Sequence, residues 1–164
     1  MSSSIPLWSY NCGGYALGTY NWLLPYEDED EEDSRCDFVY DLNTKGDYTN
    51  TDLANILLEQ DVAYLLDTYE DLIDDLESLD LANEDDIVIA YRVCVYNNND
   101  WFDSTDVTTD FHFKVRIDGQ WYEKQGNSQV KECELKPDEF WYIPGDDSIE
   151  YNSDIHYFRR KKKI

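Results

Sequence analysis

The stretch Phe-His-Phe-Lys-Val-Arg-Ile-Asp-Gly-Gln-Trp-Tyr-Glu at residues 111–123 decides the fold. Apolar and polar residues alternate strictly as far as Ile117, which is the period of a strand with one buried face. Asp118-Gly119 follows, and Asp-Gly between two such runs is a strong signal for a hairpin. The two-residue turn pairs Ile117 with Gln120 and so fixes the register of both strands. The sequence therefore predicts an antiparallel hairpin.

Two longer patterns precede this hairpin. The segment Ile87–Tyr96 is rich in β-branched residues and almost continuously apolar, which predicts a buried central strand. Residues 51–79 carry apolar side chains at spacings of three and four, which predicts an amphipathic helix with Thr51 as its N-cap. The pattern fits one helix or two helices that meet near Asp61.

The remaining elements are shorter. Residues 14–24 are predicted to form a helix that ends before Pro25, because the residue before a proline disfavours helical backbone. Segments at 139–143 and 155–158 are expected to add edge strands. Since helices come first and antiparallel strands second, we expect an α+β fold.

The composition is strongly acidic. The 164 residues include 37 Asp and Glu against 13 Lys and Arg, for a net charge of −24. This length suits one domain, which we expect over residues 1–158, with a self-repelling acidic loop at 27–33 and a basic tail at 159–164. The charge argues against direct binding of nucleic acid and against anionic membrane surfaces, and it favours basic protein partners.

Targeting and cysteine patterns narrow the class further. We see no secretory signal pattern and no apolar run near the ~20 residues of a membrane span, so we expect a cytoplasmic protein. The cysteines are dispersed and form no Cys-x-x-Cys pair, which argues against a zinc site and a disulfide framework. We expect reduced thiols, no metal and no cofactor. The four cysteines are Cys12, Cys36, Cys94 and Cys133.

Cys12 stands in Asn11-Cys12-Gly13-Gly14, at the mouth of the first predicted helix. A helix N-terminus carries partial positive charge and unpaired N–H groups, which favour a thiolate. We expect the two glycines to leave room for a substrate carbonyl, and the same N–H groups could bind the oxyanion of acyl transfer. The alternative is that Cys12 is a small buried residue beside a glycine turn.

His112 lies at the start of the predicted hairpin. The register places it opposite Gln125, with Glu123 and Asn127 as diagonal neighbours about 7–8 Å away. Any of the three could fix the tautomer with which an imidazole takes a thiol proton. Because basic residues such as Lys114 share the face of His112, we also expect that face to be solvated. The alternative is therefore a surface histidine on a hairpin.

Four motifs, within residues 8–24 and 86–127, belong together: Asn11-Cys12-x-x-Tyr15-Ala16-Leu17, Ile89-Ala90-Tyr91-Arg92, Asp110-Phe111-His112-Phe113 and Trp121-Tyr122-x-Lys124-x-Gly126. They resemble a family of predicted papain-like cysteine peptidases from bacterial and phage genomes. The resemblance implies a helix that carries Cys12 packed on an antiparallel sheet. The helix predicted at about 51–79 has no counterpart in this family, so we expect it to be a helical insertion. The resemblance also implies that Cys12 is the nucleophile and His112 the general base, in a protein of bacterial or phage origin.

Papain-like enzymes usually place a Gln upstream of the nucleophile as the oxyanion donor, and no Gln precedes Cys12. The oxyanion role then falls to Asn11 or to the backbone of Cys12 and Gly13. The expected function is hydrolysis of a peptide or amide substrate by a Cys–His mechanism. The alternative is a non-enzymatic acidic protein that mimics nucleic-acid charge and blocks a basic partner. The hydrolase needs Cys12 and His112 in contact, whereas the mimic needs only an acidic surface.

Overall fold

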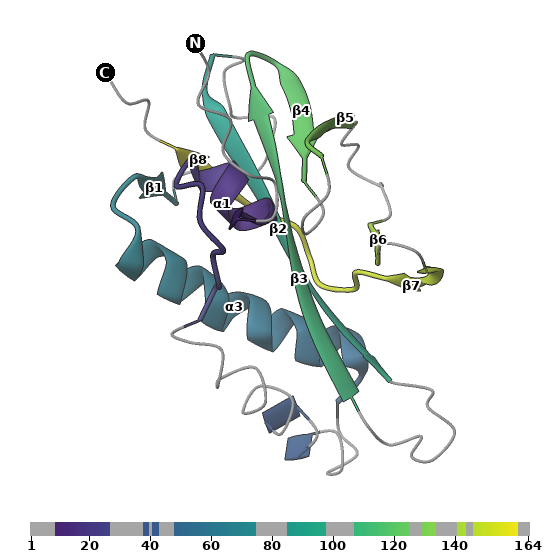
Figure 1. The fold of residues 1–164 in the computed structure, drawn as a ribbon. Coiled ribbons are helices and arrows are strands. Elements are labelled where there is room, and N and C mark those ends of the chain that lie inside the picture. The colour runs from purple at the N-terminus through teal and green to yellow at the C-terminus, as the bar shows by residue number, and fades with distance from the viewer. Residues whose placement is uncertain are drawn as a thin grey trace.

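The computed structural model describes residues 9–26, 38–39, 41–42, 48–74, 85–97, 107–124, 129–133, 141–143 and 146–160. Its elements are α1 (Cys12–Leu17), α3 (Asn50–Thr68), β1 (Leu72–Ile73), β2 (Ile87–Asn97), β3 (Val107–Ile117), β4 (Gln120–Glu123), β5 (Lys131–Cys133), β6 (Tyr142–Ile143), β7 (Asp146–Glu150) and β8 (His156–Arg160). Six strands form one antiparallel sheet in the order β1-β8-β2-β3-β4-β5, and β6 pairs with β7 (Figure 1). The predicted α+β class is confirmed.

The hairpin of β3 and β4 has the predicted register. Ile117 pairs with Gln120, and Lys114 pairs with Glu123. Asp118 and Gly119 have φ values of 51° and 81°, the left-handed backbone that a tight two-residue hairpin turn requires. The strand β3 begins four residues earlier than the alternation indicated. The predicted central strand is also confirmed, because β2 lies between β8 and β3.

The long helix α3 is continuous through Asp61. Thr49, rather than the predicted Thr51, is its N-cap and forms a capping box with Asp52. The predicted extension to residue 79 is wrong, because Leu72 already pairs with β8 as part of β1. Asp61 does not interrupt the helix: it is buried against β2, where its carboxylate accepts a 2.5 Å hydrogen bond from the Tyr91 hydroxyl.

The first helix is shorter than predicted. It ends at Gly18, whose φ of 72° supplies the left-handed residue that commonly closes a helix, and not at Pro25. Beyond Gly18 the chain reverses, and Asn21 comes to lie beside the first turn of α1. Arg160 donates a hydrogen bond to the carbonyl of Ala16 near the C-terminal end of α1. Two residues that the sequence assigned to the basic tail, 159 and 160, therefore belong to β8.

The C-terminal strand is not an edge strand. β8 lies between β1 and β2, so the very short β1 forms that edge of the sheet. The other predicted late strand is represented by β6, which among the described strands pairs with β7 and does not join the six-stranded sheet. The acidic loop at 27–33 and the end of the tail at 161–164 lie outside the described residues.

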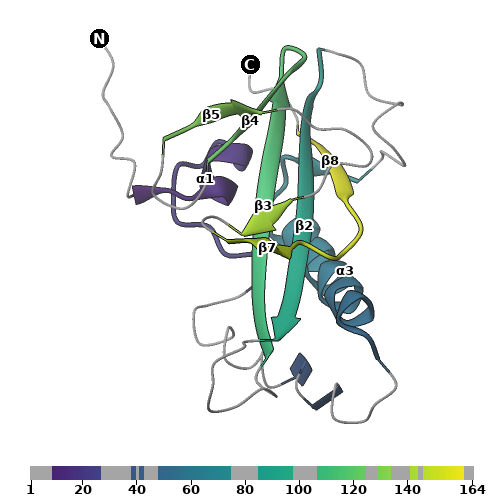
Figure 2. The ribbon, with the colours of Figure 1, turned by 90° about the vertical axis from the view of Figure 1, so that its right-hand side faces the viewer.

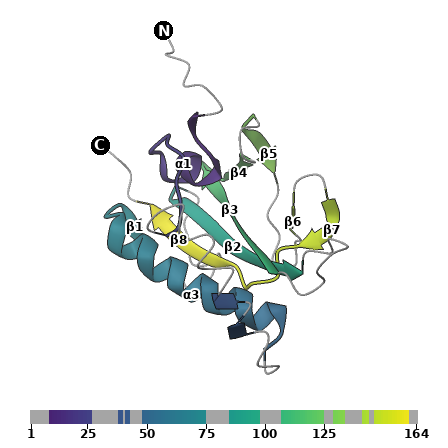
Figure 3. The same cartoon turned by 60° about the horizontal axis from the view of Figure 1, so that its bottom comes forward.

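The two faces of the sheet differ. The helix face is the apolar side that α1 and α3 cover, and its core includes Ile89, Tyr91, Val93, Phe113 and Val115. The polar face is the opposite side, which carries His112, Lys114, Arg116 and Glu123. Figure 3 shows α1 and α3 on one side of β2 and β3 and the β6–β7 hairpin on the other. In Figure 2, β7 crosses in front of β2 and β3.

The polar face is buried, so the prediction that solvent covers it is wrong. His112, Lys114 and Glu123 are each at most 6% exposed. The cover comes from Trp141 and Tyr151, which flank the β6–β7 hairpin and are joined by a 2.7 Å backbone hydrogen bond. The alternation of the hairpin predicted correctly that His112 lies on the face opposite the apolar core. It could not predict that residues later in the chain would bury that face.

Candidate active site

Cys12 is the first residue of α1, and the side chain of Asn11 holds this end of the helix. The Asn11 Oδ1 atom accepts hydrogen bonds from the backbone N–H groups of Gly14 and Leu23, both at 3.0 Å. The Asn11 Nδ2 atom donates to the Leu23 carbonyl at 2.7 Å. Asn11 therefore caps the helix and also ties the returning chain to it, which fixes the backbone that carries Cys12.

The glycines after Cys12 are required by close packing. A Cβ atom on Gly13 would lie 2.8 Å from Leu23 Cδ2, and one on Gly14 would lie 1.9 Å from the Asn21 carbonyl oxygen. Leu23 and Asn21 therefore fill the space in the direction in which a side chain would project, and the room expected there for a substrate carbonyl is absent on that side. The glycines instead bring α1 close to the 21–23 segment.

The side chains of Cys12 and His112 meet, although one hundred residues separate them in the sequence. Cys12 is 5% exposed and packs in the core of the helix face. Its side chain interacts with that of His112 of β3, and this interaction raises the pKa of His112. The Nε2 atom of His112 is buried and makes no hydrogen bond within ordinary limits. The contact that the sequence required for a Cys–His pair is present.

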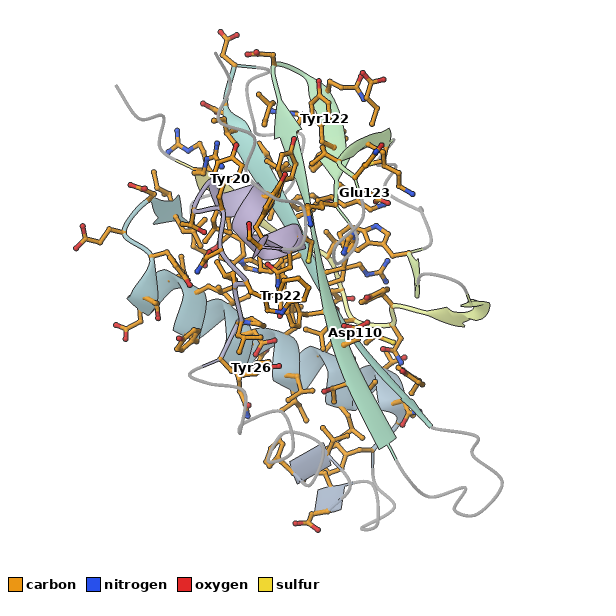
Figure 4. The ribbon with its side chains drawn as sticks, viewed as in Figure 1. Tyr20, Trp22, Tyr26, Asp110, Tyr122 and Glu123 are labelled. Atoms are coloured by element: carbon orange, nitrogen blue, oxygen red, sulfur yellow. The ribbon has the colours of Figure 1, made fainter. Side chains whose placement is uncertain are left out.

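Glu123 also lies beside the imidazole of His112. Its Oε2 atom is 3.7 Å from His112 Nε2, longer than an ordinary hydrogen bond, so the two groups interact mainly as charges. Two lysines share the same carboxylate: Lys114 Nζ is 3.5 Å from Oε2, and the more exposed Lys131 Nζ is 3.3 Å from Oε1. In Figure 4, Glu123 lies higher and Asp110 lower along the sheet, and His112 comes between them by register.

These contacts set the protonation states of His112 and Glu123. Burial alone would lower the pKa of His112, but its interactions with Cys12 and Glu123 outweigh burial and raise that pKa to about 9. Burial would raise the pKa of Glu123, but His112, Lys114 and Lys131 together lower it to about 2. At neutral pH the site therefore holds an imidazolium beside a carboxylate.

Aromatic rings enclose the imidazole. The ring of Trp141 stands edge-on to His112 at 5.7 Å between centroids, and the ring of Tyr151 lies at 6.1 Å. The Tyr151 hydroxyl donates to Asp110 Oδ2 at 3.0 Å. Burial, with the Asp110 carboxylate, raises the pKa of Tyr151, so this phenol stays a donor. The cover excludes water from His112 and Glu123 and strengthens the interaction between their charges.

The sequence pointed to Cys12, His112 and Glu123, which interact in the structure, and it did not point to Trp141 and Tyr151. The aromatic run at 140–142 was a signal, but it carried no information on which face it would cover. Gln125 and Asn127, the other predicted orienting residues, lie outside the described residues. The oxyanion roles of Asn11 and Gly13 stay predictions, and the side chain of Asn11 is already engaged with Gly14 and Leu23.

The described ranges contain no group of three or more His, Cys, Asp and Glu side chains arranged to hold a metal ion. They also contain no helix that is long and apolar enough to cross a membrane. A cavity of about 240 Å³ lies at the opposite end of α1 from Cys12, lined by Leu17, Thr19, Thr68, Tyr69, Glu70, Asp71, Leu72 and Arg160. Cys12, Cys94 and Cys133 are free thiols.

Comparison with known proteins found no match among family models, curated proteins or solved structures.

Proposed function

We propose that this protein is a thiol-dependent peptidase or amide hydrolase of papain-like type, with Cys12 as nucleophile and His112 as the proton-transfer group. The observation that carries the proposal is the buried Cys12–His112 contact, backed by the Glu123 carboxylate. A cysteine that only fills the core gains nothing from a buried histidine, which costs free energy unless partners compensate it. A nucleophile, in contrast, needs a base within hydrogen-bond reach and a third group that orients the base.

The raised pKa of His112 favours the imidazolium, which can donate a proton to the leaving group, and in the proposed reaction Cys12 attacks as a thiolate. The Cys12 sulfur attacks the carbonyl carbon of the substrate, and the carbonyl electrons move onto its oxygen. The C–N bond then breaks as the His112 proton passes to the leaving nitrogen, which yields an amine and a thioester. Neutral His112 takes a proton from water, the resulting hydroxide adds to the thioester, and loss of the sulfur restores the thiolate and releases a carboxylic acid.

Other groups in the site support these steps. Glu123 holds the imidazole ring and favours its charged form, and Trp141 with Tyr151 keeps water away from both. For the oxyanion we assign the backbone N–H groups of Cys12 and Gly13, since the first N–H groups of a helix have no partner within it.

Selective alkylation tests the proposal. Near pH 6.5 an ordinary thiol with a pKa of about 8.5 is only about 1% thiolate. We therefore expect iodoacetamide, read by mass spectrometry, to label Cys12 faster than Cys133, although Cys12 is the more buried of the two. Cys94 is fully buried and is the control for intact folding. An epoxysuccinyl peptide, which alkylates the nucleophile of thiol peptidases, should modify the same sulfur.

The variant His112→Ala should slow Cys12 labelling below pH 8 and leave Cys94 unlabelled. Equal labelling of Cys12 in wild type and His112→Ala would remove the hydrolase proposal.

Such a result would favour the alternative function, an acidic mimic of nucleic acid, which the net charge of −24 supports. A mimic binds a basic protein through attraction that salt screens over about 8–10 Å, and it should bind equally well as Cys12→Ser.

A further inference from the structure

Lys124 is the most unusual buried group outside the Cys12–His112–Glu123 set. It directly follows β4, and its side chain is 0% exposed, although lysine is almost never fully buried unless it is paired. Its ammonium group donates a hydrogen bond to the carbonyl of Tyr10 and lies 4.4 Å from the centroid of the Tyr10 ring. Both contacts bind Lys124 to the residue two positions before Cys12.

These contacts hold a charge where it costs free energy. A carbonyl and an aromatic face are neutral acceptors, and they recover only part of what an ammonium loses on leaving water. Burial accordingly lowers the pKa of Lys124, and the electrostatic interaction that opposes this shift is with Cys12. A residue whose only task is to fix Tyr10 would need a hydrogen-bond donor there, but not a positive charge.

The groups that interact electrostatically with Cys12 belong to three parts of the chain. His112 lies in β3, Lys124 directly follows β4, and Tyr151 directly follows β7. Tyr151 stays neutral, because burial and Asp110 raise its pKa. The cations among these groups are His112 and Lys124. Their behaviour in the proposed reaction differs, since His112 gives up its proton to the leaving group while Lys124 keeps its own.

We propose that Lys124 is a positioning residue for the nucleophile: its ammonium group pins the Tyr10–Cys12 segment and keeps a constant positive charge beside the Cys12 sulfur. This inference rests on the proposed hydrolase function. It assigns to Lys124 a task that His112 cannot perform throughout the reaction, because the charge of His112 is lost when the leaving group is protonated.

Three variants separate the charge from the hydrogen bond. Lys124→Met removes both, Lys124→Gln keeps a donor without charge, and Lys124→Arg keeps the charge. Cys12 labelling by iodoacetamide is measured from pH 5 to 9 in each, with Cys94 labelling as the monitor of folding. We expect Met and Gln to slow Cys12 labelling near pH 6 by about tenfold or more and to move its pH profile upward by about one unit. Arg should stay closer to wild type.

Each result decides the proposal. If Lys124→Gln labels like wild type, the charge has no role and the proposal is overturned. If all three variants slow Cys12 equally and expose Cys94, Lys124 only supports the fold, which also overturns it. The wild-type protein alone tests the underlying function, since Cys12 that labels no faster than Cys133 removes both proposals. If Cys12 labels faster than Cys133 in wild type and the Lys124 variants label Cys12 like wild type, only the proposal for Lys124 is overturned.

Discussion

The two faces of the sheet are buried to a similar degree but by different means. On the helix face, α1 and α3 cover apolar residues such as Phe113 and Val115, so burial itself supplies the stability. On the polar face, His112 and Glu123 are as deeply buried, and each buried charge is stabilised by the opposite charge of the other. Adjacent residues of β3 point alternately to the two faces, so one strand supports the core and presents His112. The stability of the fold and the chemistry of the site should therefore respond to different substitutions.

The largest expected effect is on the helix face. Phe113 is 1% exposed and contacts the rings of Tyr91 and Phe111. Phe113→Ala should lower the free energy of unfolding by about 3–5 kcal/mol, because it removes apolar contacts and leaves a cavity. Urea denaturation followed by tryptophan fluorescence measures this. A loss below ~1 kcal/mol would show that the helix face is not the main source of stability.

A buried hydrogen bond between α3 and β2 should have the next largest effect. Tyr91→Phe removes the hydroxyl that donates to Asp61, whose side chain is 1% exposed. Because it leaves a buried carboxylate with one donor fewer, we expect a loss of about 1.5–3 kcal/mol. Asp61→Asn in the Tyr91→Phe background should recover part of that loss. If Tyr91→Phe is as stable as wild type, other groups already satisfy Asp61.

The sequence predicted best the features that depend on residues close together in the chain. The hairpin and its register followed from Asp118-Gly119 and strict alternation, which are local. The ends of the helices did not: Gly18, rather than Pro25, closes α1, because a left-handed residue ends a helix before a later proline can.

The contacts of the site divide in the same way. The diagonal placement of Glu123 relative to His112 followed from hairpin register, and the pairing of Cys12 with His112 came from the resemblance. The burial of His112 depends on Trp141 and Tyr151, which reach the polar face through contacts distant in sequence. The burial of Lys124 depends on its meeting Tyr10 across 114 residues. Neither leaves a periodic trace in the sequence.

The pH dependence of stability should single out the polar face. The pKa of His112 is raised from 6.5 to about 9, so its contribution is complete below pH 6.5 and is lost as the pH rises through 9. The pKa of Glu123 is lowered from 4.5 to about 2, so its contribution is complete above pH 4.5 and is lost as the pH falls through 2. Both contributions are complete together only between about pH 4.5 and 6.5.

The variant Glu123→Gln should therefore be less stable than wild type by about 1–3 kcal/mol inside that window. The difference should shrink toward pH 9 and toward pH 2, whereas the deficit of Phe113→Ala should change much less over the same range. Urea titrations at several pH values measure both. A Glu123→Gln deficit that stays constant with pH would mean that shape, and not charge, holds His112.

The smallest effect should come from the exposed edge of the same polar face. Lys131 and Lys114 reach the same Glu123 carboxylate at similar distances, but the side chain of Lys131 is 59% exposed and that of Lys114 only 6%. Water and salt screen the outer pair, so Lys131→Met should cost no more than about 0.2–1 kcal/mol, and less in 1 M salt. Lys114→Met should cost more and depend less on salt, because it removes a buried cation from Glu123 and from the Trp141 ring, 4.5 Å from Lys114 Nζ. If the two variants prove equally stable and equally sensitive to salt, solvent reaches the whole polar face, and the exclusion of water from His112 by Trp141 and Tyr151 fails with it.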